Sequence, residues 1–186
     1  SNTWAPQPPT PSLDFDHAVE SLGSQLRGKR VALLVCGGIA ALKAPLIARC
    51  LRRYQADVVC YASSEALRYV TKESLEWASY NSVVTALSAN SEHLNKEKPF
   101  DVFLVAPATY NTINKLRFGI ADSVLTTTLA PALGLCERGA TSLIMAPTMH
   151  GDFHNSILQE SIEILSSKGV RFIPPRDGLG KHNLPD

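Results

Sequence analysis

Short apolar runs alternate with segments of helical periodicity along most of this chain. The apolar runs occupy 31–35, 56–61, 101–106, 141–146 and 170–173, and their length is typical of strands buried on both faces. Helical patterns fill 39–53, 63–69, 71–78, 111–118, 123–132 and 155–168. Strand–helix alternation at this spacing predicts right-handed crossovers and a doubly wound parallel sheet, an α/β fold.

The two ends of the chain have a different character from this central part. The first eleven residues contain four prolines and almost no apolar periodicity, so we expect residues 1–28 to be a leader without a signal peptide. Within it, 15–26 is weakly helical and could form an arm that packs against a neighbour. Residues 29–175 are expected to be one domain. The Gly- and Pro-rich residues 176–186 are expected to be a flexible flap.

Composition and charge exclude several classes of function. The 186 residues include 18 basic and 17 acidic ones and no basic stripe, so nucleic acid is not an expected partner. No apolar stretch reaches the roughly 18–20 residues of a membrane span. Four cysteines stand far apart without a CxxC pair, which favours reduced, buried thiols in a cytoplasmic protein. No metal-ligand spacing is present, and we expect no metal site.

Three of the predicted strands end in turns with the chemistry of a binding site. Gly37 and Gly38 follow the first strand and would let a ligand phosphate approach the backbone at a helix N-terminus, although a plain tight turn fits too. Ser63 or Ser64, after the second strand, could cap a helix or bind a phosphate oxygen. Small, hydroxyl and amide residues follow Pro107 at the end of the third strand. In a parallel sheet these turns lie at one edge, so they should line one crevice.

Four motifs in order resemble the flavin-containing cysteine decarboxylase family, which includes phosphopantothenoylcysteine decarboxylases and the peptidyl-cysteine decarboxylases of lantibiotic biosynthesis. Residues 37–43, GGIAALK, are similar to the family's "SGGIAAYK", with Cys36 where serine is usual. Residues 107–112, PATYNT, match "PASANT", and 119–122, GIAD, match "GxAD". Residues 147–154, PTMHGDFH, stand in the place of "PxMNxxMW". The resemblance spans 29–168 and implies a three-layer, Rossmann- or flavodoxin-like fold that binds FMN.

The resemblance also implies roles for individual residues. The first turn and the hydroxyl after the second strand would hold the FMN phosphate, and the 107–111 segment would pack on the flavin ring. In the family, a histidine at the offset of His93, fourteen residues before Pro107, is an active-site base or orienting group, whereas the residues around it also fit an exposed polar segment. The expected cofactor-binding residues are Gly37, Gly38, Ile39, Ser64, Pro107, Ala108, Thr109, Tyr110, Asn111 and Thr148.

The substrate end departs from the family pattern. Met149 is retained, but His150 replaces the asparagine that binds the substrate carboxylate; as a cation, His150 could still bind a carboxylate. No cysteine follows Cys136, so the thiol that phosphopantothenoylcysteine decarboxylases carry on a C-terminal flap is missing. Both changes argue against the coenzyme A pathway enzyme specifically. They leave flavin binding untouched.

The predicted function is therefore an FMN-dependent enzyme that oxidatively decarboxylates a small-molecule or peptide cysteinyl substrate. The family resemblance implies a homotrimer or a higher homo-oligomer. Two alternatives share the fold. One is a non-catalytic FMN-binding regulatory protein. It is favoured because His150 replaces the asparagine of the substrate clamp, the motif at 147–154. The other is a flavin prenyltransferase, which is disfavoured because the loops contain no obvious basic cluster for a prenyl phosphate.

Overall fold

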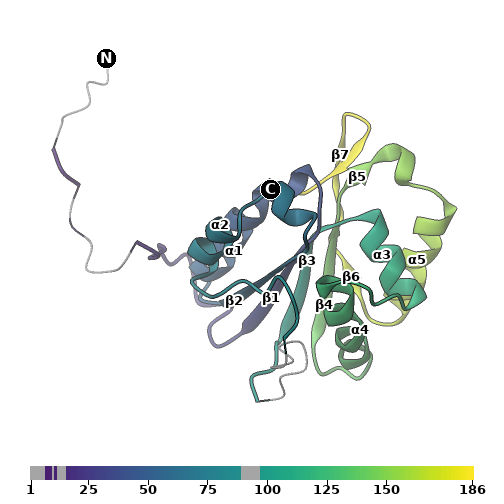
Figure 1. The fold of residues 1–186 in the computed structure, drawn as a ribbon, viewed down its shortest axis with the longest axis horizontal. Helices are drawn as coiled ribbons and strands as arrows, with labels where there is room; N and C mark the ends of the chain where they lie inside the picture. The colour runs from purple at the N-terminus through teal and green to yellow at the C-terminus, as the bar shows by residue number, and fades with distance from the viewer. Residues whose placement is uncertain (1–6, 10, 12–15, 89–96) are drawn as a thin grey trace.

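A five-stranded parallel sheet forms the centre of the molecule (Figure 1). The computed structural model describes residues 7–9, 11, 16–88 and 97–186. The strands pair in the order β2-β1-β3-β4-β6, and every pairing in this sheet is parallel. The predicted doubly wound α/β fold is thus confirmed. The strands are β1 (Arg30–Val35), β2 (Asp57–Ala62), β3 (Val102–Ala108), β4 (Ser142–Pro147) and β6 (Arg171–Phe172).

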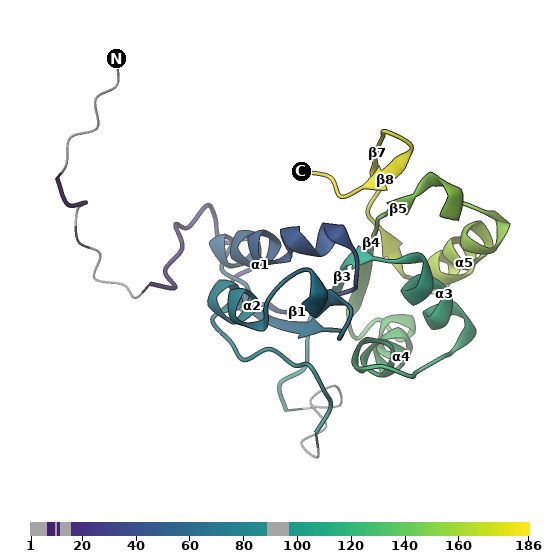
Figure 2. The ribbon, with the colours of Figure 1, turned by 45° about the horizontal axis from the view of Figure 1, so that its top comes forward.

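Helices cover the two faces of this sheet unequally (Figures 1 and 2). Successive strand residues alternate between the faces, so that Leu33 packs in one core cluster and Leu34 in the other. One cluster joins the sheet to α1 and α2, and the other joins it to α3, α4 and α5. The helices are α1 (Ala44–Arg53), α2 (Lys72–Ser79), α3 (Tyr110–Phe118), α4 (Val124–Glu137) and α5 (Ser156–Ser167), with short 3-10 turns η1 (Ile39–Lys43), η2 (Ala66–Arg68) and η4 (Gly151–Phe153).

Several element boundaries differ from those predicted. The first helix begins as the 3-10 turn η1, and Pro45, which has no N–H to donate, stands in the first turn of α1. The helix predicted at 63–69 is only η2, because Thr71 adopts an extended backbone and caps the next helix. Helix α4 continues through Pro131 to Glu137. Strand β3 runs two residues further than predicted, to Ala108, with a register shift against β4 after Val105.

The described part of the N-terminal segment is not helical. Between residues 16 and 28 it lies along α1 and α2 of its own chain, where the backbone N–H of Leu22 donates to the carbonyl of Arg53 at 2.8 Å. The indole of Trp77 donates to Asp16 at 3.1 Å, and the His17 ring stacks on Tyr80. The weak helical pattern is wrong here because tertiary bonds to α1 and α2 replace the intrahelical ones.

A second, smaller sheet lies at the C-terminus (Figure 2). Its antiparallel strands are β5 (Met149–His150), β7 (Arg176–Gly178) and β8 (Lys181–Asn183), in the order β5-β8-β7. Residues 176–186, expected as a flexible flap, therefore contain a β-hairpin. Leu179 and Gly180 form its two-residue loop, and both have positive φ, as a type I′ turn requires. Leu184, just beyond the hairpin, is buried in the core cluster beneath α1.

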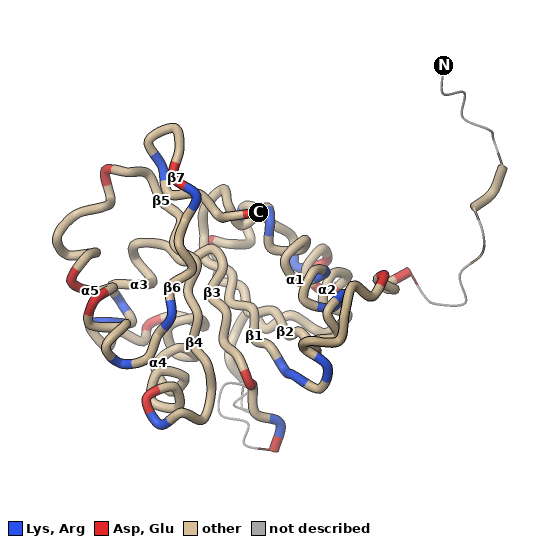
Figure 3. The backbone as a smooth tube through the Cα atoms, turned by 180° about the vertical axis from the view of Figure 1, so that it is seen from behind, with Lys and Arg blue, Asp and Glu red and all other residues tan. Residues whose placement is uncertain are grey.

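Charges of both signs are scattered over the fold, and Figure 3 shows no stripe of one sign. Among the described residues, no helix is long and apolar enough to cross a membrane, and no group of His, Cys, Asp or Glu is arranged to hold a metal ion. All four cysteines are free thiols. The prediction of buried thiols is confirmed for Cys36 and Cys60, and burial raises the pKa of Cys60 to about 12. It is wrong for Cys50, which is exposed on α1.

Candidate functional site

A cavity lies at the carboxyl edge of the sheet, where the strand order reverses. From β1 the chain turns to β2 on one side, while β3, β4 and β6 extend to the other. Such a switch point is where open α/β sheets bind their ligands. The cavity holds about 440 Å³ and contains residues from all three predicted turns, so the expectation that they line one crevice is confirmed. The lining residues are Cys36, Gly37, Gly38, Ser63, Ser64, Glu65, Tyr69, Thr109, Asn111, Thr112, Lys115, Ser123, Leu125 and Thr126.

The two glycines of the first turn are needed for different reasons. A Cβ added to Gly37 would lie 2.6 Å from Cβ of Glu65, so this position must be glycine for the turn after β2 to approach. Gly38 has φ 135° and ψ 162°, a conformation that is essentially restricted to glycine, and nothing lies within 4 Å of its added Cβ. The first turn therefore packs on the second turn through Gly37 and leaves open space above Gly38.

The two serines of the second turn divide two tasks between them. The hydroxyl of Ser63 accepts a hydrogen bond from the backbone N–H of Ala66 at 3.1 Å and so caps η2. In the part of the chain that the structure describes, the hydroxyl of Ser64 makes no hydrogen bond, and this residue lines the cavity. Of the two candidate phosphate ligands, Ser64 is therefore the available one.

The third turn holds a chain of hydroxyl and thiol contacts. The Thr109 hydroxyl caps α3 by accepting from the N–H of Thr112 at 3.2 Å, and it lies 3.1 Å from the Thr112 hydroxyl. The Cys36 thiol donates to the same Thr112 hydroxyl at 3.2 Å. Burial raises the pKa of Cys36, so this thiol stays protonated and acts as a donor that ties β1 to α3. It is a structural contact rather than a nucleophile.

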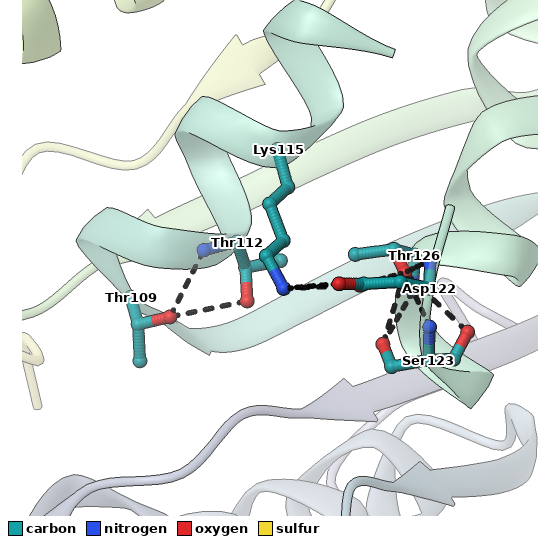
Figure 4. A network of polar contacts seen from close by, with 6 residues as sticks. All are labelled: Thr109, Thr112, Lys115, Asp122, Ser123 and Thr126. Carbon is teal, nitrogen blue, oxygen red and sulfur yellow. Dashed lines mark hydrogen bonds and ion pairs between the residues drawn. The ribbon is translucent and has the colours of Figure 1, made fainter. Parts of the chain in front are cut away.

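An ion pair fixes α3 to the start of α4 on the far wall of the cavity (Figure 4). The Lys115 ammonium lies 3.0 and 2.8 Å from the two oxygens of Asp122. The Thr126 hydroxyl accepts from the backbone N–H groups of Asp122 and Ser123, both at 2.9 Å, and the Ser123 hydroxyl caps α4. The hydrogen bond from Lys115 holds the pKa of Asp122 below its ordinary value. Among the described lining residues, Lys115 is the one lysine or arginine, and Asp122 neutralises it.

The structure does not bring every predicted site residue into this cavity. Gly37, Gly38, Ser64, Thr109 and Asn111 line it. The others are not among the described lining residues. Ile39 is exposed at the start of η1, Pro107 and Ala108 belong to β3, Tyr110 opens α3, and Thr148, Met149 and His150 follow β4. His93 lies outside the described residues.

The segment after β4 is held to both β3 and the C-terminal hairpin. The backbone N–H of Thr148 donates to the carbonyl of Ala108 at 3.1 Å. Met149 and His150 form β5 and pair with His182 and Lys181 of β8. The imidazole of His150 accepts from the N–H of Asp152 at 3.2 Å and lies 3.4 Å from its carboxylate.

Sequence reasoning assigned no role to Lys115, Ser123 or Thr126. The GIAD motif at 119–122 marked Asp122 as a family position, but nothing in the motif names its partner. The pairing with Lys115 depends on the loop between α3 and α4, where Gly119 ends the first helix with φ 74°. A search for S/T-x-x-T at the start of a helix would have found the Ser123–Thr126 cap.

With the geometry in place, comparison with known proteins assigns the class. The model of the family described as Flavoprotein matches residues 19–184, and the chain belongs to this family. It is 36% identical over 162 residues to a coenzyme A biosynthesis bifunctional protein CoaBC of Thermococcus kodakarensis, covering 84% of this chain and 39% of that protein. It is 29% identical to a probable phosphopantothenoylcysteine decarboxylase of Streptococcus mutans, covering 81% and 85% of the two chains.

Solved structures agree on the fold. The crystal structure of the FMN-dependent cysteine decarboxylase SpaF matches with a TM-score of 0.73 and 24% identity, covering 87% of this chain and 91% of that one. The chain spans about two fifths of the length of the CoaBC relatives that it matches. The predicted family is confirmed.

Proposed function

We propose that this protein binds FMN in the cavity at the β1/β3 switch point. The observation that carries the proposal is the convergence of three strand-end turns on one cavity of about 440 Å³, within the range of cofactor sites. The residues fit the group. Open space above Gly38 admits a phosphate to the backbone, and Ser64 offers a hydroxyl that has no hydrogen-bond partner among the described residues. Membership of the flavoprotein family and the FMN-dependent neighbour SpaF support the same cofactor.

The residues have distinct tasks in this proposal. Gly37, Gly38, Ile39 and Ser64 hold the phosphate through backbone N–H groups and one hydroxyl, so no cation is needed in the lining. Residues 107–111 and Thr148 lie against the flavin ring. The Cys36–Thr112–Thr109 contacts and the Lys115–Asp122 ion pair keep the third turn and α4 at a fixed distance from the first turn.

We propose further that the bound flavin serves the oxidative decarboxylation of a cysteine-derived carboxylate. Flavin supplies the two-electron oxidation, which makes the carboxylate of the substrate a better leaving group as carbon dioxide. His93 orients that carboxylate or moves a proton, and Met149 and His150 contact the substrate. The names of the Streptococcus mutans relative, a probable phosphopantothenoylcysteine decarboxylase, and of SpaF, an FMN-dependent cysteine decarboxylase, support this class of reaction. The identity of the cysteinyl substrate, a small molecule or a peptide, is decided by the clamp at 147–154.

Two measurements test these proposals separately. Purified protein should be yellow, or should take up added FMN with quenched flavin fluorescence and a higher melting temperature. FMN at a hundredfold excess over its Kd stabilises by about 2.7 kcal/mol. Anaerobic mixing with peptides that end in cysteine should then bleach the flavin absorbance and release carbon dioxide. Absence of flavin binding contradicts the first proposal, and bound flavin that no cysteinyl compound bleaches contradicts the second.

One observation favours a second candidate, a non-catalytic FMN-binding regulatory protein. His150 stands where the family has its carboxylate-binding asparagine, and its imidazole is already engaged by Asp152. A side chain held in this way has less freedom to receive a substrate carboxylate. If flavin binds but no cysteinyl compound reacts, while His150→Asn creates the reaction, the regulatory function is the better one.

We also propose that the protein works as a cytoplasmic homo-oligomer, a homotrimer as the family resemblance implies. Three large apolar side chains along η1 and α1 are unusually exposed for their type: Ile39 at 70%, Leu42 at 55% and Leu46 at 69%. Beside them, an apolar groove of about 450 Å³ runs between α1 and the faces of β3 and β4. Light scattering should show a trimer, and Leu46→Glu should dissociate it. A monomeric wild type at micromolar concentration contradicts this proposal.

A further inference from the structure

Three side chains at the C-terminal sheet are joined in a line of hydrogen bonds that the flavin site does not use. Nδ1 of His182 lies 2.5 Å from Oδ1 of Asp177, and Nε2 of His182 lies 2.8 Å from Nδ1 of His154. Asp177 and His182 belong to β7 and β8, whereas His154 follows η4. The His182 side chain is the covered centre of the line, only 19% exposed, while that of Asp177 is 70% exposed.

The chemistry of these groups fixes where the protons lie. An ionised carboxylate only accepts hydrogen bonds, so Nδ1 of His182 carries the proton toward Asp177. In the neutral His182 ring, Nε2 then carries no proton and accepts a hydrogen bond. The proton between the two rings is therefore bonded to Nδ1 of His154. This leaves Nε2 of His154 without a proton. In the part of the chain that the structure describes, Nε2 of His154 has no hydrogen-bond partner, so it is free to accept one.

The line can take up one proton and move its charge inward. When Nε2 of His154 gains a proton, the proton between the rings can pass from Nδ1 of His154 to Nε2 of His182. The positive charge then lies on His182 beside the Asp177 carboxylate, and His154 is neutral again. A second proton is opposed, because two N–H groups would face each other at 2.8 Å. This is the arrangement by which a carboxylate and an imidazole support a base.

The two residues that flank His154 contact the predicted flavin segment. Asn155, the residue after His154, caps α5, and its amide donates to the Tyr110 hydroxyl at 3.2 Å. Phe153, the residue before, packs on the Tyr110 ring with 5.4 Å between centroids. Both neighbours of His154 therefore contact Tyr110, within the segment 107–111. Strand β8, which carries His182 at the centre of the line, pairs with the proposed substrate residues of β5.

We propose that Asp177, His182 and His154 form a proton relay, and that Nε2 of His154 takes the thiol proton of a cysteinyl substrate. The inference rests on the proposed function for its substrate. In the step, the S–H bond breaks, an N–H bond forms at His154 and the electron pair stays on sulfur as a thiolate. The proton's charge passes to His182. His154 is then a catalytic residue, and His182 and Asp177 are positioning residues.

Other charged groups surround the relay and enter its pH dependence. The β5–η4 segment carries His150 and Asp152, which contact each other. The hairpin carries Arg176 and Lys181 in addition to the relay. Arg176 makes no salt bridge among the described residues, so Arg176→Gln is a matched control that changes the hairpin charge without touching the relay.

The first test reads the protons directly. In ¹⁵N NMR of the whole protein above neutral pH, both His154 and His182 should be Nδ1–H tautomers, and Asp177→Asn should change the tautomer of His182. An Nε2–H tautomer at either ring overturns the relay, whatever the protein's activity.

The second test is anaerobic flavin bleaching by a peptide that ends in cysteine. His154→Gln should slow bleaching about 10²-fold or more at pH 7, the usual loss for an acid–base group. The rate should recover above about pH 8.5, where the peptide thiol ionises unaided. His182→Gln and Asp177→Asn should slow bleaching at least about tenfold, since they release the tautomer of His154. Arg176→Gln should match the wild type.

The outcomes separate this inference from the proposed function. A wild-type rate in His154→Gln, or a loss that high pH does not restore, overturns the thiol-base role. If the wild type binds FMN but no cysteinyl compound, peptide or small molecule, bleaches it, the decarboxylase proposal and the thiol-base role fail together, and the tautomers alone decide whether the relay exists.

Discussion

The cofactor cavity and the C-terminal sheet lie at the same edge of the molecule but are built in opposite ways. The turns that line the cavity follow parallel strands of six and seven residues. Helix caps and the Lys115–Asp122 ion pair hold these turns in place. The C-terminal sheet has strands of two or three residues, and every residue of β7 is exposed. The chain matches the family motifs in the first region and departs from them in the second.

This difference teaches where the fold tolerates change. The three turns of the cavity are coupled, because Gly37 packs on Glu65 and Cys36 bonds Thr112, so a substitution in one turn displaces another. The hairpin contacts the rest of the molecule through β5, through Leu184 and through hydrogen bonds that join Gly180 and His182 to the segment around η4. New side chains can therefore enter the hairpin without disturbing the flavin site. Two of the three residues of the proposed relay lie in this hairpin, where substitutions disturb the flavin site least.

The largest effect on the cavity is expected from a substitution at Gly38. Gly38→Val places a β-branched residue at φ 135°, strained by about 1–3 kcal/mol, and fills the open space above the turn. We expect a folded protein that retains no flavin, measured by absorbance after desalting. Gly134→Ala is the matched control: it lies inside α4, where the added Cβ meets only Arg138 at 3.5 Å, and flavin content should not change. Wild-type flavin in Gly38→Val would place the phosphate elsewhere.

The next largest effect is expected for His93, which lies outside the described residues. His93→Asn should lower the rate of decarboxylation 10²–10⁴-fold, the usual loss for an acid–base group. Stability should change by less than about 1 kcal/mol, because the sequence around His93 is polar and we expect no large apolar contact to be lost. The variant should stay yellow in the absorbance assay while carbon dioxide release stops. Full turnover with this substitution would remove the protein from the family's mechanism.

A third prediction separates the hairpin from the cavity with a pair of glycines. Gly180 has φ 69° in the hairpin loop, so Gly180→Val should cost about 1–2 kcal/mol and lower the melting temperature. Gly178→Ala, at negative φ with nothing within 4 Å of the added Cβ, should be nearly neutral. FMN affinity should be unchanged in both variants, since neither Gly178 nor Gly180 lines the cavity, while Gly180→Val should lose turnover. A parallel loss of flavin would show that the two regions are coupled.

The smallest effect is expected for the ion pair on the cavity wall. The hydrogen bond from Lys115 lowers the pKa of Asp122 in the folded state. The ion pair therefore contributes fully to the stability of the fold when pH is above the ordinary pKa of an aspartate. This contribution is lost as pH falls through the folded value. Asp122→Asn should therefore melt slightly below the wild type at pH 7. The two melting temperatures should converge only when pH falls below the lowered pKa of Asp122, which is under the ordinary value of about 3.9. A difference that persists in acid would assign the effect to packing instead.

Much of the scaffold could be predicted from the residues alone. Apolar runs such as 31–35 and 102–105 specify buried strands because every side chain faces a hydrophobic layer, and glycines or caps such as Thr109 and Asn155 mark where helices end and begin. The order of these elements leaves few topologies. The convergence of the turns after β1, β2 and β3 then follows from parallel strands having their carboxyl ends at one edge.

The sequence did not decide which polar groups meet. The sequence does not distinguish the roles of Ser63 and Ser64. Only the backbone path of η2 makes the Ser63 hydroxyl a helix cap and leaves the Ser64 hydroxyl available in the cavity. Lys115 finds Asp122 through the loop between two helices, and His154 meets His182, 28 residues away, through a hairpin whose Leu–Gly loop gives no strong turn signal. Hydrophobic periodicity records local geometry and burial. Contacts between distant polar side chains depend on strand register and loop path, which only the folded chain fixes.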